Sequence, residues 1–443
     1  MALLRRLGIA LVQWEWLGLL ALLPAVILIR PDLTPLLLLL PGLWLLRQRV
    51  TGRFVTPTPL DGALLLLLIM LLVSLYATFD LAFSLDKIAG LLLGLALFYA
   101  VTAMASRSPG WLALAVTLHL GWGTAVALIG FLGTRWSNKL PLLGGLIAQL
   151  PPRLLTIPGG PDTLNPNQVA GVLLWVVPVA WLLVALLLWR PAPLRQRGRW
   201  AGWGIILLLT LGTALFMTAV LLLTQSRSAI IGLAVAAGLM LLLVSWLRST
   251  RFLVVTALLL LLLAAGLWQA TAVWSLPFLT NGTEMLLDDQ LTLGSLDGRV
   301  EIWSRAVYGL QDFPFTGMGM GTFRRVVHIL YPLFLISPTT DIAHAHNQFL
   351  QTGLDLGLPG LIAYLALWLG TAVMLIQTMT TARDPWLRGL AVGLAGSLGA
   401  YFVYGLTDTV ALGAKPGFIF WYLLGLVAGL HRLSESRIVE SEK

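Results

Sequence analysis

Two of the five histidines in the chain, His344 and His346, stand two residues apart where a long polar stretch meets an apolar one. A histidine side chain exchanges a proton near neutral pH, so one placed at such a boundary is suited to act as a general base. A zinc site is a second interpretation, because His328 and Asp341 lie close in the sequence and would complete the ligands. A third is a hydrogen-bonded structural role. The residues alone leave these interpretations open, although the irregular ligand spacing disfavours zinc.

Two arginines have the chemistry to bind a phosphate group. Arg227 stands in a short turn, residues 224–228, between two long apolar segments, and Arg299 begins a stretch with helical spacing. The planar guanidinium offers five donors and suits phosphate oxygens, so together the two could grip a diphosphate. The structural alternatives are that Arg227 snorkels from a helix end and that Arg299 pairs with Asp297 or Glu301.

These residues belong to a chain of 443 residues that is 58% hydrophobic and only 11% charged. Soluble proteins carry about 25% charged residues, and the mean hydropathy here is +0.90. The sequence therefore predicts an all-α polytopic membrane protein, with residues 1–443 forming a single integral membrane domain. Because the chain has no cysteine, disulfides and thiolate metal sites are excluded.

Apolar segments of about the length that crosses a bilayer predict about twelve transmembrane helices. They fall at 11–29, 33–46, 60–78, 88–105, 111–133, 168–189, 202–223, 228–247, 252–274, 357–378, 386–405 and 416–431. The first resembles a signal peptide without a cleavage site and is interpreted as a retained helix. The second is short and contains proline, so of the twelve segments it has the weakest evidence for a complete crossing.

Two long loops on one side of the membrane, residues 134–167 and 275–356, are expected to be functional. Within the larger loop, residues 299–310 have apolar positions at helical spacing, which predicts a short helix lying along the membrane face. The glycine run at 317–321 lacks the Lys-Ser/Thr that follows a phosphate-binding loop, and it is interpreted as a turn.

The net charge of +9 reflects topology rather than nucleic-acid binding. If the N-terminus is cytoplasmic, most of the 28 lysines and arginines fall on the cytoplasmic side of short loops, as the positive-inside rule requires. An even number of spans then places both termini in the cytoplasm. Both long loops, with His346, Arg227 and Arg299, face outward.

Several motifs together resemble the bacterial O-antigen ligases and their polymerase relatives. His346-Asn347, nine residues and then Gly357-Leu358-Pro359-Gly360 is similar to the family's H-[N/S/Q]-x9-G-x-x-G signature, and Thr224-Gln225-Ser226-Arg227 to its T-x-S-R motif. Asn165-Pro166-Asn167, the stretch Leu296–Phe323 and Asp408 also resemble family features. The clearest resemblance covers residues 165–431.

The resemblance implies a glycosyltransferase of the membrane-embedded C type, with short interfacial helices in a large periplasmic loop. The donor would be a glycan on undecaprenyl diphosphate and the acceptor lipid A-core oligosaccharide or another glycan, with catalysis at the periplasmic face of the inner membrane. No metal or other cofactor is implied, and the remaining partners are membrane lipids. Carried over by position, His346, Arg227 and Arg299 would be catalytic. Further substrate-binding residues would be Asn347, Arg153, Arg324, Arg325, Trp303 and Asp408.

Other functions share parts of this pattern. An O-antigen polymerase or a protein O-oligosaccharyltransferase would use the same donor site, so the motifs leave the acceptor open. From another class, a transporter of bicarbonate or of lipid-linked sugars would carry more charged residues within its spans than this sequence has. The His346-Asn347 pair favours transfer chemistry over transport.

Overall fold

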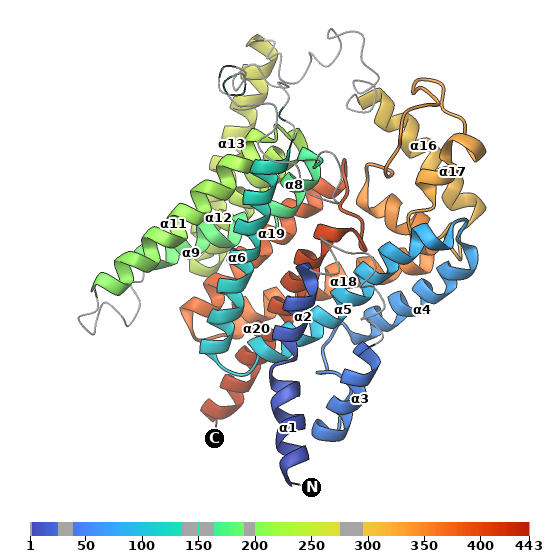
Figure 1. Cartoon of the computed structure of the whole chain (residues 1–443). Coiled ribbons are helices and arrows are strands. Elements are labelled where there is room, and N and C mark those ends of the chain that lie inside the picture. Colours follow the sequence, from blue (N-terminus) through green and yellow to red (C-terminus); the bar gives the residue numbers. More distant parts are fainter. Residues whose placement is uncertain are drawn as a thin grey trace.

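The structure is a computed structural model that describes residues 2–24, 39–134, 164–189, 200–274 and 296–442, together with isolated residues between 136 and 149 (Figure 1). Within these residues the chain is helical and has no β-strand, which confirms the predicted all-α class. The helices are α1 (Ala2–Gln13), α2 (Glu15–Pro24), α3 (Leu39–Thr51), α4 (Asp61–Ala77), α5 (Leu81–Ala105), α6 (Pro109–Gly133), α8 (Pro166–Leu173), α9 (Val177–Trp189), α11 (Trp200–Leu223), α12 (Arg227–Arg248), α13 (Thr250–Trp274), α16 (Leu296–Asp312), α17 (Phe323–Leu330), α18 (Gln348–Thr381), α19 (Pro385–Gly405), the 3₁₀ turn η3 (Lys415–Gly417) and α20 (Phe418–Glu442).

Eight helical segments in the described part of the chain are long and apolar enough to cross a membrane. They comprise α5, α6, α8 with α9, α11, α12, α18, α19 and α20. The shorter apolar helices α4 and α13 match two more of the predicted segments. The first two predicted segments, 11–29 and 33–46, fall partly outside the described residues. The polytopic membrane class is confirmed.

Two helix boundaries differ from the prediction. The segment predicted at 11–29 is described up to Pro24, and there it consists of two helices, α1 and α2, that meet at Trp14. Helix α18 begins at Gln348, but its backbone is non-helical at Gly357, the residue at which the apolar segment was predicted to begin. The turns before Gly357 were missed by hydropathy because they carry polar side chains that are buried against protein.

Helix α20 lies at the centre of the bundle and packs along α5 through small residues. A Cβ atom added to Gly94 would come within 2.1 Å of the Trp421 ring, and one added to Gly425 within 2.8 Å of the Phe98 carbonyl oxygen. Since lipid tails are as apolar as leucine, membrane helices associate largely through such close packing. The α5–α20 pair forms the rigid centre around which the other helices pack.

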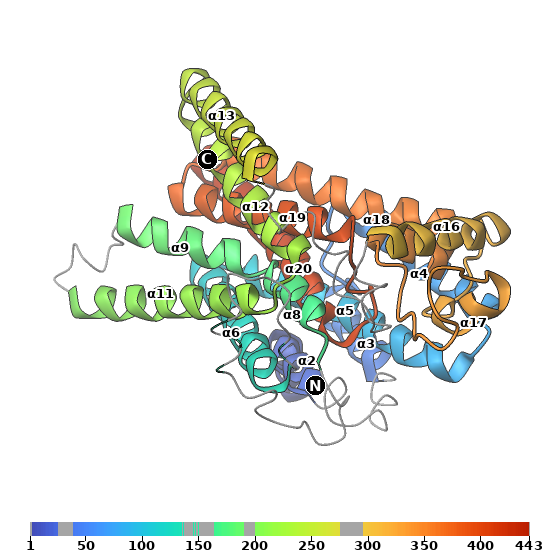
Figure 2. The ribbon, with the colours of Figure 1, turned by 90° about the horizontal axis from the view of Figure 1, so that it is seen from above.

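Segments that the topology prediction placed on one side of the membrane meet at one end of the bundle. The Thr78 hydroxyl, after α4, lies 3.0 Å from the Thr322 hydroxyl in the large loop. The Ser228 hydroxyl, at the start of α12, lies 2.7 Å from the Thr407 hydroxyl after α19. Seen from above, α16 lies along α18 at this same end (Figure 2). This end is called the loop end below.

Segments predicted on the other side meet at the opposite end, called the terminal end because α1 and the end of α20 lie there (Figure 1). Arg107, after α5, donates to the Gln13 carbonyl oxygen at 2.9 Å. Arg432 of α20 donates to the Pro57 carbonyl oxygen at 2.5 Å. These contacts thus group the connecting segments at the two ends of the bundle in the same way as the charge pattern assigned them to the two sides of the membrane.

Candidate active site

The two histidines sit immediately before α18, in a segment whose backbone is fixed on both sides. Asn347 caps the helix: its side-chain oxygen accepts the backbone N–H groups of Phe349 and Leu350, each at 2.9 Å. The Asn347 amide donates to the Leu406 carbonyl oxygen at 3.0 Å, which ties the cap to the loop after α19. Asn347, predicted as a substrate-binding residue, thus fixes the start of α18 through its side chain.

Ala345, between the histidines, is fully buried in a small apolar cluster formed by the large loop. Its backbone N–H donates to the Gln351 side-chain oxygen at 2.8 Å. His346 has a φ of +48°, a left-handed conformation that costs a residue other than glycine about 1 kcal/mol or more. The burial of Ala345 and the cap at Asn347 hold the strained residue between them.

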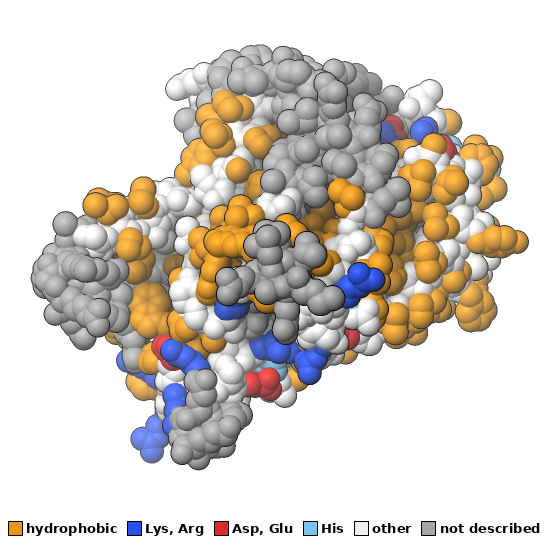
Figure 3. Space-filling view, turned by 60° about the horizontal axis from the view of Figure 1, so that its bottom comes forward, with side chains coloured by type: hydrophobic (Ala, Val, Ile, Leu, Met, Phe, Trp, Pro, Cys, Tyr) orange, Lys and Arg blue, Asp and Glu red, His pale blue; other side chains and the backbone are white. Residues whose placement is uncertain are grey.

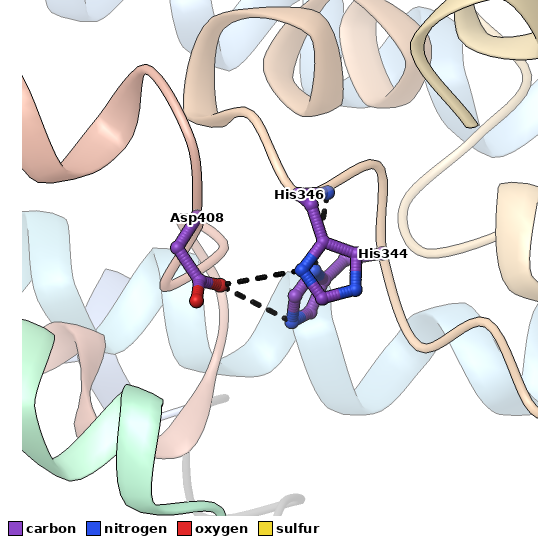
Figure 4. A group of neighbouring side chains, drawn as sticks. All are labelled: His344, His346 and Asp408. Carbon is purple, nitrogen blue, oxygen red and sulfur yellow. Dashed lines mark hydrogen bonds and ion pairs between the residues drawn. The ribbon is translucent and has the colours of Figure 1, made fainter. Parts of the chain in front are cut away.

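The histidine side chains face Asp408, which stands in the loop after α19 (Figure 4). His346 Nδ1 lies 3.6 Å and His344 Nε2 lies 4.0 Å from the same carboxylate oxygen, Oδ1. The two imidazole rings are 4.3 Å apart between centroids. Asp408 and His344 are buried, whereas the His346 side chain keeps 13% of its surface exposed. Of the three, His346 is the one that a substrate can reach.

The charge states of the two buried groups follow from their surroundings. Burial is the main cause that lowers the pKa of His344, to about 3, so this imidazole is neutral. Burial also acts to raise the pKa of Asp408, but the interaction with His346 and the charge of Arg299 outweigh it and hold the pKa at about 2. Asp408 is therefore an anion at neutral pH.

The hydrogen bonds assign a proton position to His344. The backbone N–H of His346 donates to His344 Nδ1 at 3.3 Å, so the neutral ring carries its proton on Nε2, directed toward Asp408. In His346, Nδ1 faces the carboxylate and Nε2 faces away from it (Figure 4). A proton on Nδ1 would leave Nε2 as the acceptor, which is the arrangement a general base requires.

A buried polar network fixes the position of Asp408. The backbone N–H of Asp408 donates to the Tyr404 carbonyl oxygen at 2.9 Å, and Oδ1 accepts from the backbone N–H of Thr409 at 2.9 Å. Gln348, in the first turn of α18, accepts the hydroxyl of Tyr401 at 2.9 Å through its side-chain oxygen. Through Gln348 the loop carrying Asp408 is joined to the helix that follows His346.

Helix α16 brings Arg299 and Trp303 to the same place. Trp303 Nε1 donates to the His346 carbonyl oxygen at 3.2 Å, so the residue predicted to bind substrate also holds the histidine backbone. Arg299 is close enough to affect the charge of both His344 and Asp408. The alternative pairing of Arg299 with Glu301 is not found, because Glu301 instead contacts Arg305 at 3.6 Å.

Arg227 is the first residue of α12, and its side chain is exposed. The turn before it is as tight as predicted: Thr224 to Ser226 join α11 to α12, with Gln225 at a φ of +53°. Ser228, next to Arg227, contacts Thr407, which directly precedes Asp408. The fold thus brings the Arg227 backbone to the loop that carries the carboxylate.

The glycine run of the large loop packs against a kink in α18. Gly357 has φ +71° and ψ 179° inside this helix, and a Cβ atom there would lie 2.5 Å from the Phe315 carbonyl oxygen. The backbone N–H groups of Met318 and Leu358 donate across the contact, to Leu354 at 2.7 Å and to Pro314 at 2.6 Å. The glycine run is therefore a turn, as predicted, and it positions the large loop over the start of α18.

The other predicted substrate-binding arginines lie elsewhere. Arg324 forms an ion pair with Asp341, and Arg325 lies 3.8 Å from Asp80 with its guanidinium over the Phe83 ring. Both belong to α17, and the structure pairs them with these groups rather than with the histidines. Arg153 lies outside the described residues.

The residues that could hold a metal differ from the predicted set. His328 contacts the Thr340 carbonyl oxygen at 2.7 Å, and Asp341 is paired with Arg324. In the described part of the chain the candidate ligands are instead His344, His346 and Asp408, whose ligand atoms lie within 4.8 Å of one another. Three such ligands with an open position are compatible with zinc, so the donor set alone does not separate a metal centre from a base and its carboxylate.

Sequence reasoning passed over the polar residues at the start of α18. Gln348, Gln351 and Asp355 are all buried, and Gln351 Nε2 donates to Asp355 Oδ1 at 2.8 Å. Asp355 Oδ1 also accepts the backbone N–H of Gly321 at 2.9 Å. The signal was present, because residues three and four apart share one face of a helix. That spacing marks a polar face turned toward the large loop.

The fold and the site together define a multi-pass helical membrane protein that joins a histidine–aspartate cluster to Arg299 at one end of its bundle. Residues 212–365 match the model of a family described as O-antigen ligase. The matched part contains Arg227, Arg299 and His346 and ends before Asp408. The match covers less than half of the chain and supports a relation to the O-antigen ligases and their polymerase relatives, a family of glycosyltransferases. No curated protein matches the chain significantly.

Proposed function

We propose that the protein is an O-antigen ligase-like transferase that moves a glycan en bloc from undecaprenyl diphosphate to lipid A-core oligosaccharide. The observation that carries this proposal is that His346, Asp408 and the helix bearing Arg299 meet at one end of a membrane bundle. His346 and Arg299 lie within the residues that match the family, and Asp408 follows them. The positive-inside pattern supports a periplasmic site, an inner-membrane location and cytoplasmic termini.

In the proposed reaction His346 acts as the general base. The acceptor hydroxyl oxygen attacks the anomeric carbon of the donor sugar and passes its proton to His346 Nε2. The bond from that carbon to the diphosphate oxygen breaks, so undecaprenyl diphosphate leaves with the bonding electrons. A single displacement of this kind inverts the anomeric centre. Asp408, as an anion 3.6 Å from His346 Nδ1, stabilises the imidazolium that forms.

Arg227 and Arg299 would bind the diphosphate and neutralise the charge that develops as it leaves. Arg299 Nε is buried without a hydrogen-bond partner among the described residues, and so is Asp408 Oδ2. Leaving such groups unpaired costs about 1–3 kcal/mol each, a cost that a bound substrate would relieve. Because diphosphate is a good leaving group, arginine charge suffices and no step passes through a metal.

Reconstituted transfer tests the proposal. Purified protein in liposomes would receive undecaprenyl-diphosphate glycan and lipid A-core acceptor, and the product would be followed by its shift in mass. We expect His346→Ala and Arg227→Ala to abolish transfer, and the matched control His328→Ala, on α17, to retain it. Undiminished transfer by His346→Ala would refute the mechanism.

The acceptor is tested in the same system. An O-antigen polymerase would extend a second lipid-linked glycan, and a protein O-oligosaccharyltransferase would modify a peptide hydroxyl, each with the same dependence on His346. Movement of bicarbonate or of lipid-linked sugar across the liposome without a new glycosidic bond would instead show a transporter. The lipid A-core ligase proposal requires that the lipid A-core acceptor give the most product.

A further inference from the structure

A second polar cavity lies at the terminal end of the bundle, away from the histidines. Its volume is about 330 Å³, and it is bounded by α1, α3 and the turn between α5 and α6. Arg47 and Arg107 line it together with the hydroxyl-bearing side chains of Thr51 and Ser106. The polar part of its wall is therefore basic and rich in donors.

The charges around this cavity do not cancel. Arg47 is buried and forms an ion pair with Glu15, and its second terminal nitrogen donates to the Thr56 hydroxyl at 2.6 Å. Arg107 lies close enough to feel both charges of this pair, attracted by Glu15 and, less strongly, repelled by Arg47. Two arginines against one glutamate leave one positive charge in excess. A ligand with a single negative charge would balance the site.

Arg107 forms no direct ion pair with an acidic side chain among the described residues, and it shares the charge of Glu15 with Arg47. It donates one hydrogen bond to the Gln13 carbonyl oxygen, and its guanidinium lies 5.1 Å from the centre of the Trp111 ring. These contacts fix the guanidinium but supply no anion. A planar guanidinium fixed in this way offers its other donors to phosphate oxygens.

Part of the cavity wall is apolar and is formed by Ile9, Val12, Val50 and Ala103. A free inorganic ion gains nothing from such a wall, whereas glycerol and acyl carbons would bury against it. The lining therefore combines a site for one negative charge with a surface for hydrocarbon. This combination fits an amphiphile better than a soluble anion.

The position of the cavity along α5 agrees with a membrane boundary. Near the start of this helix, Ser84 donates to the Met320 carbonyl oxygen at 2.8 Å, at the loop end. The 25 residues of α5 span about 38 Å at 1.5 Å per residue, somewhat more than the ~30 Å hydrocarbon core. Arg107 follows the other end of the helix, and basic side chains gather on the face shown in Figure 3. The cavity thus lies at headgroup depth on the side opposite the histidines.

We propose that this cavity binds the headgroup of an anionic glycerophospholipid through its phosphodiester. The single negative charge of the phosphodiester matches the excess of one positive charge, with Arg107 as its main partner. The glycerol carbons pack against the apolar wall. The donors to the phosphate oxygens are the remaining N–H groups of Arg107, because the Thr51 hydroxyl already donates to the Arg47 carbonyl oxygen at 2.8 Å.

Lipid titration of the full chain in detergent, followed by native mass spectrometry, tests this site. We expect phosphatidylglycerol to bind at least tenfold more tightly than phosphatidylcholine, and Arg107→Gln to remove that difference. Arg248→Gln is a matched control, because Arg248 is the last residue of the membrane helix α12 and its guanidinium also lies over a tryptophan ring, that of Trp189 at 5.0 Å, but outside the cavity. Its lipid preference should be unchanged.

A second variant separates loss of the site from loss of the fold. Thr51 is exposed, so Thr51→Glu should leave the melting temperature in lipid-free detergent unchanged while its carboxylate repels the lipid phosphate. Equal effects of Arg107→Gln and Arg248→Gln, or equal affinity for the two lipids, would overturn the proposal. Displacement of phosphatidylglycerol by millimolar inorganic phosphate would overturn the lipid assignment in favour of a free anion.

Discussion

Replacing Asp408 by asparagine removes one negative charge from the active site while keeping the shape of the side chain. The residue is buried and its backbone is held by Tyr404, so the loop should keep its position. The asparagine oxygen can still accept the backbone N–H of Thr409, as the carboxylate does at 2.9 Å. What changes is the charge facing His346.

The size of the effect follows from the 3.6 Å between His346 Nδ1 and Asp408 Oδ1. At an effective dielectric constant of about 20, unit charges at this separation attract by about 5 kcal/mol. This is an upper limit for the stabilisation of a protonated His346, and it corresponds to roughly a 10³-fold change in rate. We expect Asp408→Asn to lower kcat by 10²- to 10³-fold, with little change in KM for the lipid-linked donor.

Single-turnover transfer with labelled donor would measure this rate without a contribution from product release. Asp341→Asn is the matched control. Asp341 is an exposed carboxylate that is paired with Arg324 within the large loop, and the loss of its charge should leave the rate within about twofold of the native rate. Transfer by Asp408→Asn at more than about a third of the native rate would refute the role assigned to the carboxylate. A melting temperature equal to that of the native protein would show that the loss is chemical.

Three further predictions follow from the site and its support. Gly357→Ala should destabilise the protein by about 3 kcal/mol or more, because the left-handed backbone and the 2.5 Å approach to Phe315 exclude a side chain. Gly212→Ala, where no atom lies within 4 Å, should not lower the melting temperature. The free energy of unfolding should fall by up to about 1.4 kcal/mol per pH unit below pH 6.5. The reason is that His344 binds a proton in the unfolded chain but stays neutral in the folded protein, where its pKa is lowered to about 3. In His344→Gln, melting curves should show a smaller dependence on pH. Finally, transfer should persist in excess EDTA, whereas a rate restored only by added zinc would show that the histidine cluster is a metal centre.

Much of the fold could be predicted because a bilayer imposes simple rules on sequence. Runs of apolar residues near twenty in length gave most of the helices, and the arginines and lysines gave the alternation of loops that the structure repeats at its two ends. Where a helix is polar and covered by protein, as at the start of α18, hydropathy carries no signal. The length of that helix was therefore underestimated.

The site was predictable to the extent that its residues carry local signals. The turn before Arg227 follows from short-range chemistry and was predicted, whereas the cap at Asn347 was not. The approach of Asp408 to His346 joins residues 62 positions apart across two helices, and nothing local indicates it (408 − 346 = 62). Only the fold places the Asp408 carboxylate against the histidines.

The left-handed backbone at His346 has a consequence for how this residue is retained. Glycine or asparagine would adopt a φ of +48° at lower cost, so the backbone conformation itself does not favour an imidazole at this position. Random substitutions screened only for heat resistance would be expected to drift away from histidine there, whereas a screen for product would not. The most strained side chain of the segment is thus one whose presence folding does not explain.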